Sequence, residues 1–276
     1  MLRTIVALAK STHPVPSLAV TGIVVILGIG VGLEPWRLAL LGAVVLSNQF
    51  SVGLSNDWLD ADRDRAVGRH DKPVAEGLVS ARLARTSAFA LAGLSIALSF
   101  GLGWRAAVAL GVFLVCGWSY NLWLKSTVYS VEPYIIGFGS LPLAVTLALP
   151  TPEVASVWAV LAAALLGVAA HFANVLPDLD DDAATGVSGL PHRVGRRTTG
   201  VIIAGALVGA SGSIVFGLGP PTPALVAVAV VGTILAVVVA ILVVTNRRPR
   251  AVFALILFIA LVDVVLIAVS GAGVRG

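Results

Sequence analysis

The residues best suited to chemistry are three aspartates in a polar stretch, residues 55–77, that lies between two apolar runs. Read as a helix, Asp57, Asp60 and Asp64 are spaced i, i+3 and i+7, which places their carboxylates on one face. Asn56 lies beside them. Neighbouring carboxylates repel one another unless they share a cation, and Mg2+ binds one or two carboxylates together with substrate phosphates. The spacing therefore predicts a divalent cation site.

A second group of acidic residues lies within residues 173–186. Asn174, Asp178 and Asp182 are spaced i, i+4 and i+8, again one face of a helix, and His171 extends the same stripe. Pro177 interrupts the helical hydrogen bonds, so we expect a bend or a loosened turn there. If the two groups face each other, they form a cage for two divalent ions and a diphosphate.

Each acidic group also has a simpler interpretation. The first is typical of a solvated polar loop, because acids and arginines alternate after Asp60, and the second is typical of an acidic helix cap. The second group, however, follows its apolar run and lies near a helix C-terminus, where the helix dipole disfavours negative charge unless a cation is bound. Charged side chains that share one face at the end of a membrane helix are costly and tend to be functional. Together the two groups favour the metal site.

Basic residues near these acids are candidates for binding a diphosphate. Arg69 and Lys72 lie in the same charged stretch, and Lys125 follows the segment Tyr120-Asn121-Leu122-Trp123. Basic side chains and Mg2+ together stabilise a departing diphosphate. Taken alone, Lys125 is better explained as an anchor beside an aromatic belt at the membrane surface.

Three other ionisable residues have more than one interpretation. His171 is either a general base or a core histidine with a satisfied hydrogen bond. Asp263 lies within the last apolar run without an obvious partner, and intramembrane acids are candidates for function. His13 precedes Pro14 near the start of the first run.

The composition is that of a membrane protein. Of the 276 residues, 58% are hydrophobic and 12% are charged, and a soluble domain of this length could not bury so much apolar surface. The net charge of +4 comes from basic residues in short loops and gives no indication of a nucleic-acid partner. The single cysteine, Cys116, offers neither a disulfide nor a metal pair. No cleavable signal peptide is evident, and we expect one transmembrane domain over residues 1–276.

Most of nine apolar runs reach the about 20 residues that a bilayer core requires. The predicted spans are 16–33, 37–56, 83–103, 105–123, 132–149, 154–176, 198–218, 222–245 and 251–271. With the N-terminus in the cytoplasm, 15 of the 18 Lys and Arg residues fall on the cytoplasmic side, and Arg37, Arg105 and Arg275 fall outside. The positive-inside rule thus predicts a multi-pass integral membrane protein with both acidic groups on the cytoplasmic side.

These motifs resemble those of the UbiA-type intramembrane prenyltransferase superfamily. The signature Asn-Asp-x-x-Asp-x-x-x-Asp appears at residues 56–64, and the second signature, Asp-x-x-x-Asp, appears at residues 178–182. Lys72-Pro73 through Gly77 resembles the family's Arg-Pro…Gly segment, with Lys in place of Arg. Residues 190–195 resemble the segment after the second signature, and Lys125 matches a basic position after the fourth helix. The resemblance spans essentially the whole chain.

The resemblance implies an all-α integral membrane fold with nine transmembrane helices around a central cavity. In such proteins two Mg2+ ions, held by the two aspartate motifs, bind a prenyl diphosphate. The diphosphate leaves, an allylic cation forms, and an acceptor attacks it. Family acceptors range from hydroxybenzoates to haem and a sugar phosphate, so the family does not fix the acceptor here. His13-Pro14 stands where many members carry Arg-Pro.

We therefore expect Mg2+-dependent transfer of a prenyl group from a prenyl diphosphate to an aromatic or small lipophilic acceptor. The predicted catalytic and metal-binding residues are Asp57, Asp60, Asp64, Asp178 and Asp182. The predicted substrate-binding residues are Asn56, Arg69, Lys72, Tyr120, Asn121, Lys125, His171, Asn174 and Arg193.

Two other functions are weighed against this one. A terpene cyclase of the same superfamily needs the metal cage but no acceptor, and Trp118, Tyr120, Phe138 and Phe172 would either line its cavity or pack in its core. A secondary transporter is disfavoured, because the acids gather at one surface and not at the midplane.

Overall fold

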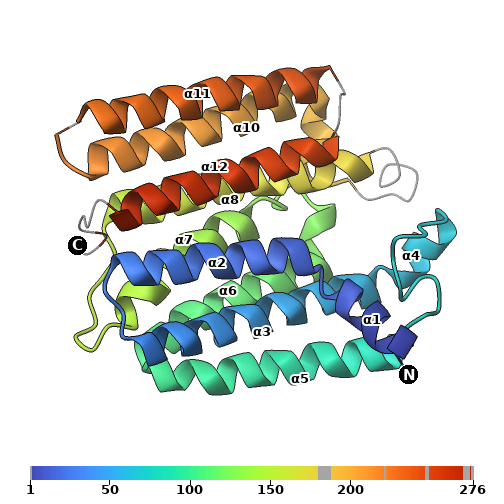
Figure 1. The fold of residues 1–276 in the computed structure, drawn as a ribbon. Coiled ribbons are helices and arrows are strands. Elements are labelled where there is room, and N and C mark those ends of the chain that lie inside the picture. Colours follow the sequence, from blue (N-terminus) through green and yellow to red (C-terminus); the bar gives the residue numbers. More distant parts are fainter. Residues whose placement is uncertain (1, 180–187, 221, 246–248, 270–273, 275–276) are drawn as a thin grey trace.

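The computed structural model describes residues 2–179, 188–220, 222–245, 249–269 and Val274, and the regular structure of this part is helical. The long helices run side by side as a bundle (Figure 1). In chain order the helices are α1 (Leu2–Ser11), α2 (Pro14–Gly30), α3 (Pro35–Leu59), α4 (Ala61–Ala66), α5 (Ala81–Ser99), the 3-10 turn η1 (Phe100–Leu102), α6 (Trp104–Leu122), η2 (Leu124–Ser126), α7 (Glu132–Leu147), α8 (Val157–Val175), η3 (Leu176–Asp178), α10 (Leu190–Gly217), α11 (Pro223–Val244) and α12 (Pro249–Val269).

Nine of these helices lie where the nine spans were predicted, which confirms the all-α membrane fold. In the described part, six are long and apolar enough to cross a bilayer alone, and α1 with α2, bent by 57°, would make a seventh. The nine-span count is therefore approximate, because α2 and α7 have only 17 and 16 residues. The chain is a multi-pass integral membrane protein.

The helix ends follow from local sequence. Proline opens α2, α3, α11 and α12, where a missing N–H costs no hydrogen bond. Ser80 caps α5 by accepting a hydrogen bond from the Leu83 N–H. The largest departure from prediction is α10, which begins at Leu190 and not near residue 198. Gly195, with φ 77°, kinks this helix, so the segment that we expected to be a loop joins the span.

Close backbone contacts hold the bundle together at small residues. A Cβ on Gly167 of α8 would lie 2.5 Å from the carbonyl oxygen of Tyr134 in α7, so only glycine fits there. Gly53 of α3 is equally close to the Thr12 carbonyl, at 2.6 Å, where α1 turns into α2. This agrees with the tight packing expected from the many small residues in the spans.

Asp263 gains a partner that the sequence did not reveal. Its side chain is buried in α12, and the Ser211 hydroxyl of α10 lies 3.3 and 3.4 Å from its two oxygens. Val264, the next residue, packs in an apolar core with Ile214 of α10 and Val24 of α2. Asp263 lines neither of the two cavities described below.

Candidate active site

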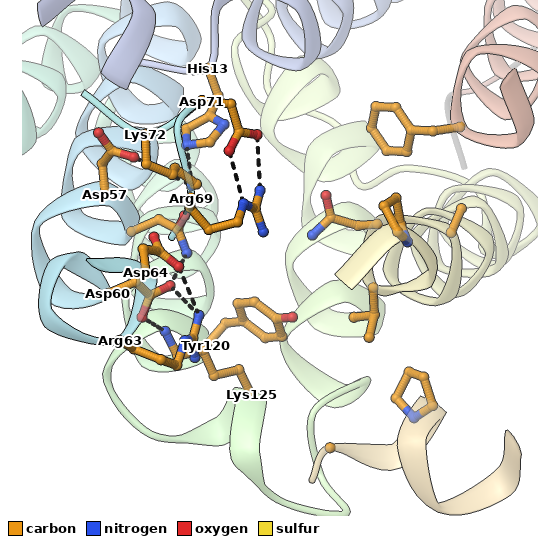
Figure 2. Close-up of a pocket in the computed structure, with 18 of the residues that line it drawn as sticks. His13, Asp57, Asp60, Arg63, Asp64, Arg69, Asp71, Lys72, Tyr120 and Lys125 are labelled. Atoms are coloured by element: carbon orange, nitrogen blue, oxygen red, sulfur yellow. Dashed lines mark hydrogen bonds and ion pairs between the residues drawn. The ribbon is translucent and has the colours of Figure 1, made fainter. Parts of the chain in front are cut away.

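A polar cavity of about 360 Å3 opens at the end of the bundle where α3 gives way to α4. One wall comes from α3, α4 and the following loop, and Figure 2 shows its acidic and basic side chains gathered on that wall. The opposite wall comes from the end of α8, from Pro177 in η3 and from the start of α10. Two stretches far apart in sequence thus meet at one cavity, as the two-motif hypothesis requires.

The helix that carries the first motif is interrupted at its middle aspartate. Asp60 lies between α3 and α4, with φ −90° and ψ −4°, and the Asp64 N–H still donates to its carbonyl at 2.8 Å. The chain therefore turns without losing the helical hydrogen bond. Asp57, Asp60 and Asp64 all line the polar cavity, although they do not lie on one straight helix.

Asp57 is the most buried of the three, with 1% of its surface exposed. The Ser11 hydroxyl donates to its Oδ2 at 2.6 Å, and Lys72 Nζ lies 3.3 Å from its Oδ1 as an ion pair. The Val74 N–H is 3.5 Å from Oδ2. These contacts tie α1, α3 and the loop after α4 together around one carboxylate.

Asp60 is surrounded by donors from separate segments of the chain. Lys125, just after α6, forms an ion pair with Oδ1, and Arg63 lies 2.9 Å from Oδ2. Asn56 also donates to Oδ2 at 2.9 Å. Lys125 thus reaches the first motif from a segment far along the chain, so its position supports a role in the site more than a simple membrane anchor.

Asp64, like Asp57, has one buried carboxylate oxygen that accepts no hydrogen bond from the described residues, but the Oδ1 of Asp57 has the Lys72 ammonium 3.3 Å away. Asp64 Oδ2 is buried and receives no hydrogen bond within the described structure, and the Arg63 guanidinium is 4.0 Å from Asp64 Oδ1. Burial raises the pKa of the Asp64 carboxyl, and the nearby Lys72 ammonium opposes this shift. A buried anionic oxygen without a donor is a position where a cation would be stabilised.

Lys72 occupies the centre of the basic group. Its Nζ donates to Asn56 Oδ1 at 3.0 Å and contacts His13 Nε2 at 3.3 Å, in addition to its ion pair with Asp57. Burial, together with the Lys72 charge, lowers the pKa of His13 to about 4. The imidazole is therefore neutral at neutral pH, and its Nε2 accepts a hydrogen bond from the Lys72 ammonium.

Arg69 faces the cavity as one half of a double hydrogen bond. Its Nε and Nη2 donate to the two oxygens of Asp71 at 2.8 and 3.0 Å (Figure 2). This bond with Arg69 lowers the pKa of Asp71 to about 2. A fork of this geometry also fits phosphate oxygens.

The donor set fits Mg2+ in its chemistry, but the site is not preformed. Among the described residues, no three His, Cys, Asp or Glu side chains are grouped as a ready metal site. Asp57 and Asp60 are instead paired with the ammonium groups of Lys72 and Lys125, respectively. The unpartnered oxygen of Asp64 is the observation that supports a metal here.

An apolar cavity of about 210 Å3 adjoins the polar one. Five residues line both cavities, which makes the two continuous; these are His13, Asn56, Tyr120, Asn174 and Phe253. The walls of the apolar cavity include the rings of Phe113, Tyr134 and Phe138. Phe113 and Phe138 meet edge to face at 6.1 Å and pack against the solid apolar core beyond. The combined space is charged at one end and apolar at the other, and aromatic rings are part of its apolar lining.

Comparisons with known proteins agree with this architecture. The profile of the UbiA prenyltransferase family matches residues 15–262. The chain belongs to the UbiA prenyltransferase family. No curated protein matches the sequence.

Solved structures resemble this UbiA-family chain in fold at low identity. A UbiA homologue from Archaeoglobus fulgidus bound to GPP and Mg2+ has a TM-score of 0.73 and 16% identity, and the match covers 96% of this chain and 98% of that one. An apo UbiA homologue from Aeropyrum pernix K1 has a TM-score of 0.71 and 17% identity, covering 91% and 96%. A digeranylgeranylglyceryl phosphate synthase has a TM-score of 0.64 and 15% identity, covering 95% and 99%.

Most of the predicted site residues of this UbiA-family protein line one of the two cavities. Those at the polar cavity are Asn56, Asp57, Asp60, Asp64, Arg69, Lys72, Tyr120, Lys125 and Asn174, and Asn121 lines the apolar one. Asn121 is held in place, because its amide donates to the Val52 carbonyl at 2.9 Å and to the Ser55 hydroxyl at 2.8 Å.

Two predicted substrate-binding residues lie elsewhere. His171 is fully buried, with Nε2 3.1 Å from the Ser130 hydroxyl and its ring against Tyr134, which favours the core histidine over the general base. Arg193 is exposed, and its Nε donates to the Ser188 carbonyl at 3.1 Å. Neither residue lines the polar or the apolar cavity.

The second motif is only partly described. As predicted, α8 ends before Pro177, and the tighter turn η3 carries the chain to Asp178. The side chain of Asp178 and the whole of Asp182 lie outside the described residues. Their role as metal ligands stays a prediction.

The polar cavity also includes residues that the sequence analysis did not select. Lys10, Arg63, Asp71 and His192 all line the polar cavity. Arg63, Asp71 and His192 lie in or beside the two charged motifs, so proximity in sequence would have found them. Lys10 lies in α1, and nothing in its local sequence points to the site.

Proposed function

We propose that this chain catalyses the Mg2+-dependent transfer of a prenyl group from a prenyl diphosphate to an aromatic or small lipophilic acceptor within the membrane. The observation that carries the proposal is the continuity of a charged cavity with an apolar one. A prenyl diphosphate matches this arrangement, because its diphosphate head is highly charged and its prenyl tail is apolar. The A. fulgidus homologue, bound to GPP and Mg2+, supports this choice of substrate.

The charged end would hold the diphosphate head. Arg69, Lys72 and Lys125 line it and carry N–H donors for phosphate oxygens, while Asp57, Asp60 and Asp64 would hold the metal together with Asp178 and Asp182 of the second motif. Mg2+, when bound, would neutralise the diphosphate and so make it a better leaving group. The basic side chains would stabilise the negative charge that grows on the departing group.

The apolar end would hold the prenyl tail. Each CH2 group moved there from water is stabilised by about 0.8 kcal/mol. When the bond between the allylic carbon and the diphosphate oxygen breaks, the electron pair leaves with the oxygen and the carbon becomes cationic. The rings of Tyr120, Tyr134 and Phe138 line this region, and aromatic faces stabilise a nearby cation. The acceptor would then attack the allylic carbon and lose a proton.

A terpene cyclase is the alternative, and the aromatic lining of the apolar cavity favours it to the same degree. A cyclase folds the tail over its own cation and shields that cation with rings. Tyr120 and Phe138, which sequence alone suggested for this role, do line the apolar cavity, whereas Trp118 and Phe172 are absent from its lining. The two functions differ in whether an acceptor is needed.

We also propose that residues 1–276 form a single prenyltransferase domain with its N-terminus and its site in the cytoplasm. The orientation rests on the positive-inside rule. Arg37, predicted to lie outside, donates to the Ala148 carbonyl at the α7–α8 connection, which that topology also places outside. Labelling of single introduced cysteines from either side of sealed vesicles tests the orientation.

The deciding experiment is an incubation of the purified chain with Mg2+ and geranyl, farnesyl or geranylgeranyl diphosphate, without any acceptor. Diphosphate release is measured, and the organic products are extracted and identified. A cyclised product establishes the cyclase. Intact donor or a linear prenyl alcohol, followed by a prenylated product when aromatic acceptors are added, establishes the transferase.

Matched variants show whether the proposed site is responsible. Asp57→Ala should abolish diphosphate release, because it removes a predicted metal ligand and the partner of Lys72. Asp62→Asn is the control, since Asp62 lies in the same stretch but is fully solvent-exposed and pairs only with the exposed Arg65. Equal activity in both variants would contradict the proposed site.

A further inference from the structure

Helix α1 has three distinct faces, and one of them is apolar and exposed. Ala7 and Ser11 are buried against the rest of the protein. Leu2, Ile5 and Val6 form a separate stripe and are 76%, 57% and 49% exposed. Such a stripe in a helix beside a membrane bundle is typical of helices that lie in the bilayer interface.

The edge of this stripe is basic. Arg3 and Lys10 of α1 are exposed and seven residues apart, so they lie on one side of the helix. Arg82 and Arg85, in the first turns of α5, are also exposed, and the buried Ala7 of α1 packs in the same cluster as Ala84 and Ala88 of α5. Helix α1 contains no acidic residue. The apolar stripe and its basic edge complement acyl chains and anionic phosphates, respectively.

We propose that α1 is a docking helix for anionic phospholipid headgroups, and that its seating on the bilayer holds one wall of the active site in place. Leu2, Ile5 and Val6 would enter the acyl boundary, and Arg3, with the exposed Arg82 and Arg85 of α5, would contact lipid phosphates. The 57° bend between α1 and α2 gives α1 a direction different from that of the membrane helices, as an interfacial helix requires (Figure 1).

The end of α1 is directly connected to the catalytic motif. Ser11, its last residue, donates to Asp57 at 2.6 Å and is itself 1% exposed. The Thr12 backbone packs directly against Gly53 of α3, so the turn after α1 is held against the helix that carries Asp57. His13 then contacts Lys72. Displacement of α1 would therefore loosen Asp57 and Lys72 together.

The proposal rests on the proposed function for its effect on catalysis, but lipid docking can be measured without any substrate. The full chain is placed in nanodiscs of phosphatidylcholine alone or of phosphatidylcholine with about one third phosphatidylglycerol, which is anionic. Each basic residue near an anionic surface should increase the ratio of docked to undocked α1 about fivefold. Hydrogen exchange of residues 2–11 reports docking. Exchange several-fold slower in the anionic discs is expected, and exchange equal in both would overturn the proposal.

Two variants separate docking from its consequence. The double substitution Ile5→Asn with Val6→Asn changes only exposed side chains, and it should remove the lipid-dependent protection and raise the donor KM several-fold with kcat unchanged. Ser11→Ala should keep the protection but abolish the dependence of donor KM on lipid. Arg105→Gln is the control and should change neither result, because Arg105 is an exposed arginine at the start of α6, which the proposed topology places on the other side of the membrane.

The outcomes distinguish the two proposals. Lipid-dependent protection in a chain that releases no diphosphate from any donor would overturn the proposed function and leave the docking helix supported. Diphosphate release by a chain whose α1 shows the same hydrogen exchange in all discs would support the proposed function and overturn the docking helix. Protection that appears only in discs holding two copies of the chain would mean that a second copy covers α1, and would overturn lipid docking.

Discussion

Replacing Asp64 with asparagine should stabilise the metal-free protein, although it should damage the enzyme. In the metal-free fold, the buried Oδ2 of Asp64 has no hydrogen-bond partner within the described structure, and burial raises the pKa of its carboxyl. The ionised group is therefore held in a place that disfavours it. Asparagine keeps the shape of the side chain and removes the charge.

The size of the effect follows from the cost of an unsatisfied buried group, about 1–3 kcal/mol. Asparagine recovers only part of this, since its own amide also needs partners, so we expect about 1 kcal/mol. For a chain of this size that corresponds to a rise of about 2–4 °C in the melting temperature. Because the folded-state pKa of Asp64 is raised, the folded wild type takes up a proton more readily than the unfolded chain. The advantage of the variant is therefore largest at neutral pH and shrinks as the pH falls and Asp64 is protonated.

Ligands should reverse the order. A ligand at a hundred times its dissociation constant stabilises the folded state by about 2.7 kcal/mol. Mg2+ with inorganic diphosphate should therefore raise the melting temperature of the wild type well above that of Asp64→Asn, which lacks one of the predicted ligands. Thermal unfolding in detergent, with and without Mg2+ and diphosphate, measures both differences.

Asp62→Asn is the control, because Asp62 is two residues away and fully exposed. It should change both melting temperatures by less than about 2 °C, because surface substitutions usually change stability by less than about 0.5 kcal/mol. The reasoning is refuted if Asp64→Asn destabilises the metal-free protein, or if Mg2+ with diphosphate stabilises Asp64→Asn as much as the wild type.

Three further predictions concern the basic side chains and the apolar cavity. Lys125→Gln breaks the ion pair with Asp60 and should lower kcat/KM for the donor about tenfold or more, since a charged hydrogen bond contributes about 1.5–3 kcal/mol. Assays of diphosphate release measure this change. An unchanged kcat/KM would indicate that Lys125 is only a membrane anchor. Asp71→Asn should raise the donor KM, because it releases Arg69 from its hydrogen bonds. The pKa of Asp71 is about 2, so the wild-type pair stays ionised at all assay pH values and is lost only as the pH falls through about 2. A difference in donor KM between wild type and variant that changes with pH near neutrality would contradict this role. Phe138→Ala should enlarge the apolar cavity that Phe138 lines. It should therefore raise the ratio of kcat/KM for geranylgeranyl over geranyl diphosphate, which competition between the two donors measures.

The parts of the fold that sequence could predict are those decided by local composition. Nine apolar runs gave nine helices, and Pro177 ended α8 where its missing N–H required it. The start of α10 was wrong, because Gly195 reads as a loop residue. In the structure Gly195, with φ 77° and ψ 166°, is a non-helical kink between two helical segments that together make up α10.

The parts of the site that sequence could not predict depend on contacts between distant segments. The spacing of Asp57, Asp60 and Asp64 identified the first motif, yet it suggested a cluster of mutually repelling acids. The structure instead pairs Asp57 with Lys72, and Asp60 with Lys125, 65 residues away. Spacing along one helix carries no information about which basic side chain folds onto it. The same limit applies to His171, whose stripe pointed to the site but whose partner, Ser130, holds it in the core.

The charges around the polar cavity imply that donor and metal bind together. In the described part of the chain, five cationic side chains line it, namely Lys10, Arg63, Arg69, Lys72 and Lys125, and four carboxylates face them, namely Asp57, Asp60, Asp64 and Asp71. The two sets nearly cancel, which explains how so many charges are tolerated at the end of a membrane bundle. It also leaves too little positive charge to hold a diphosphate alone, because Lys72 and Lys125 are already engaged by Asp57 and Asp60. A divalent cation that takes over the carboxylates would restore the missing positive charge, so we expect donor affinity to depend steeply on Mg2+ and metal affinity to depend equally on the donor.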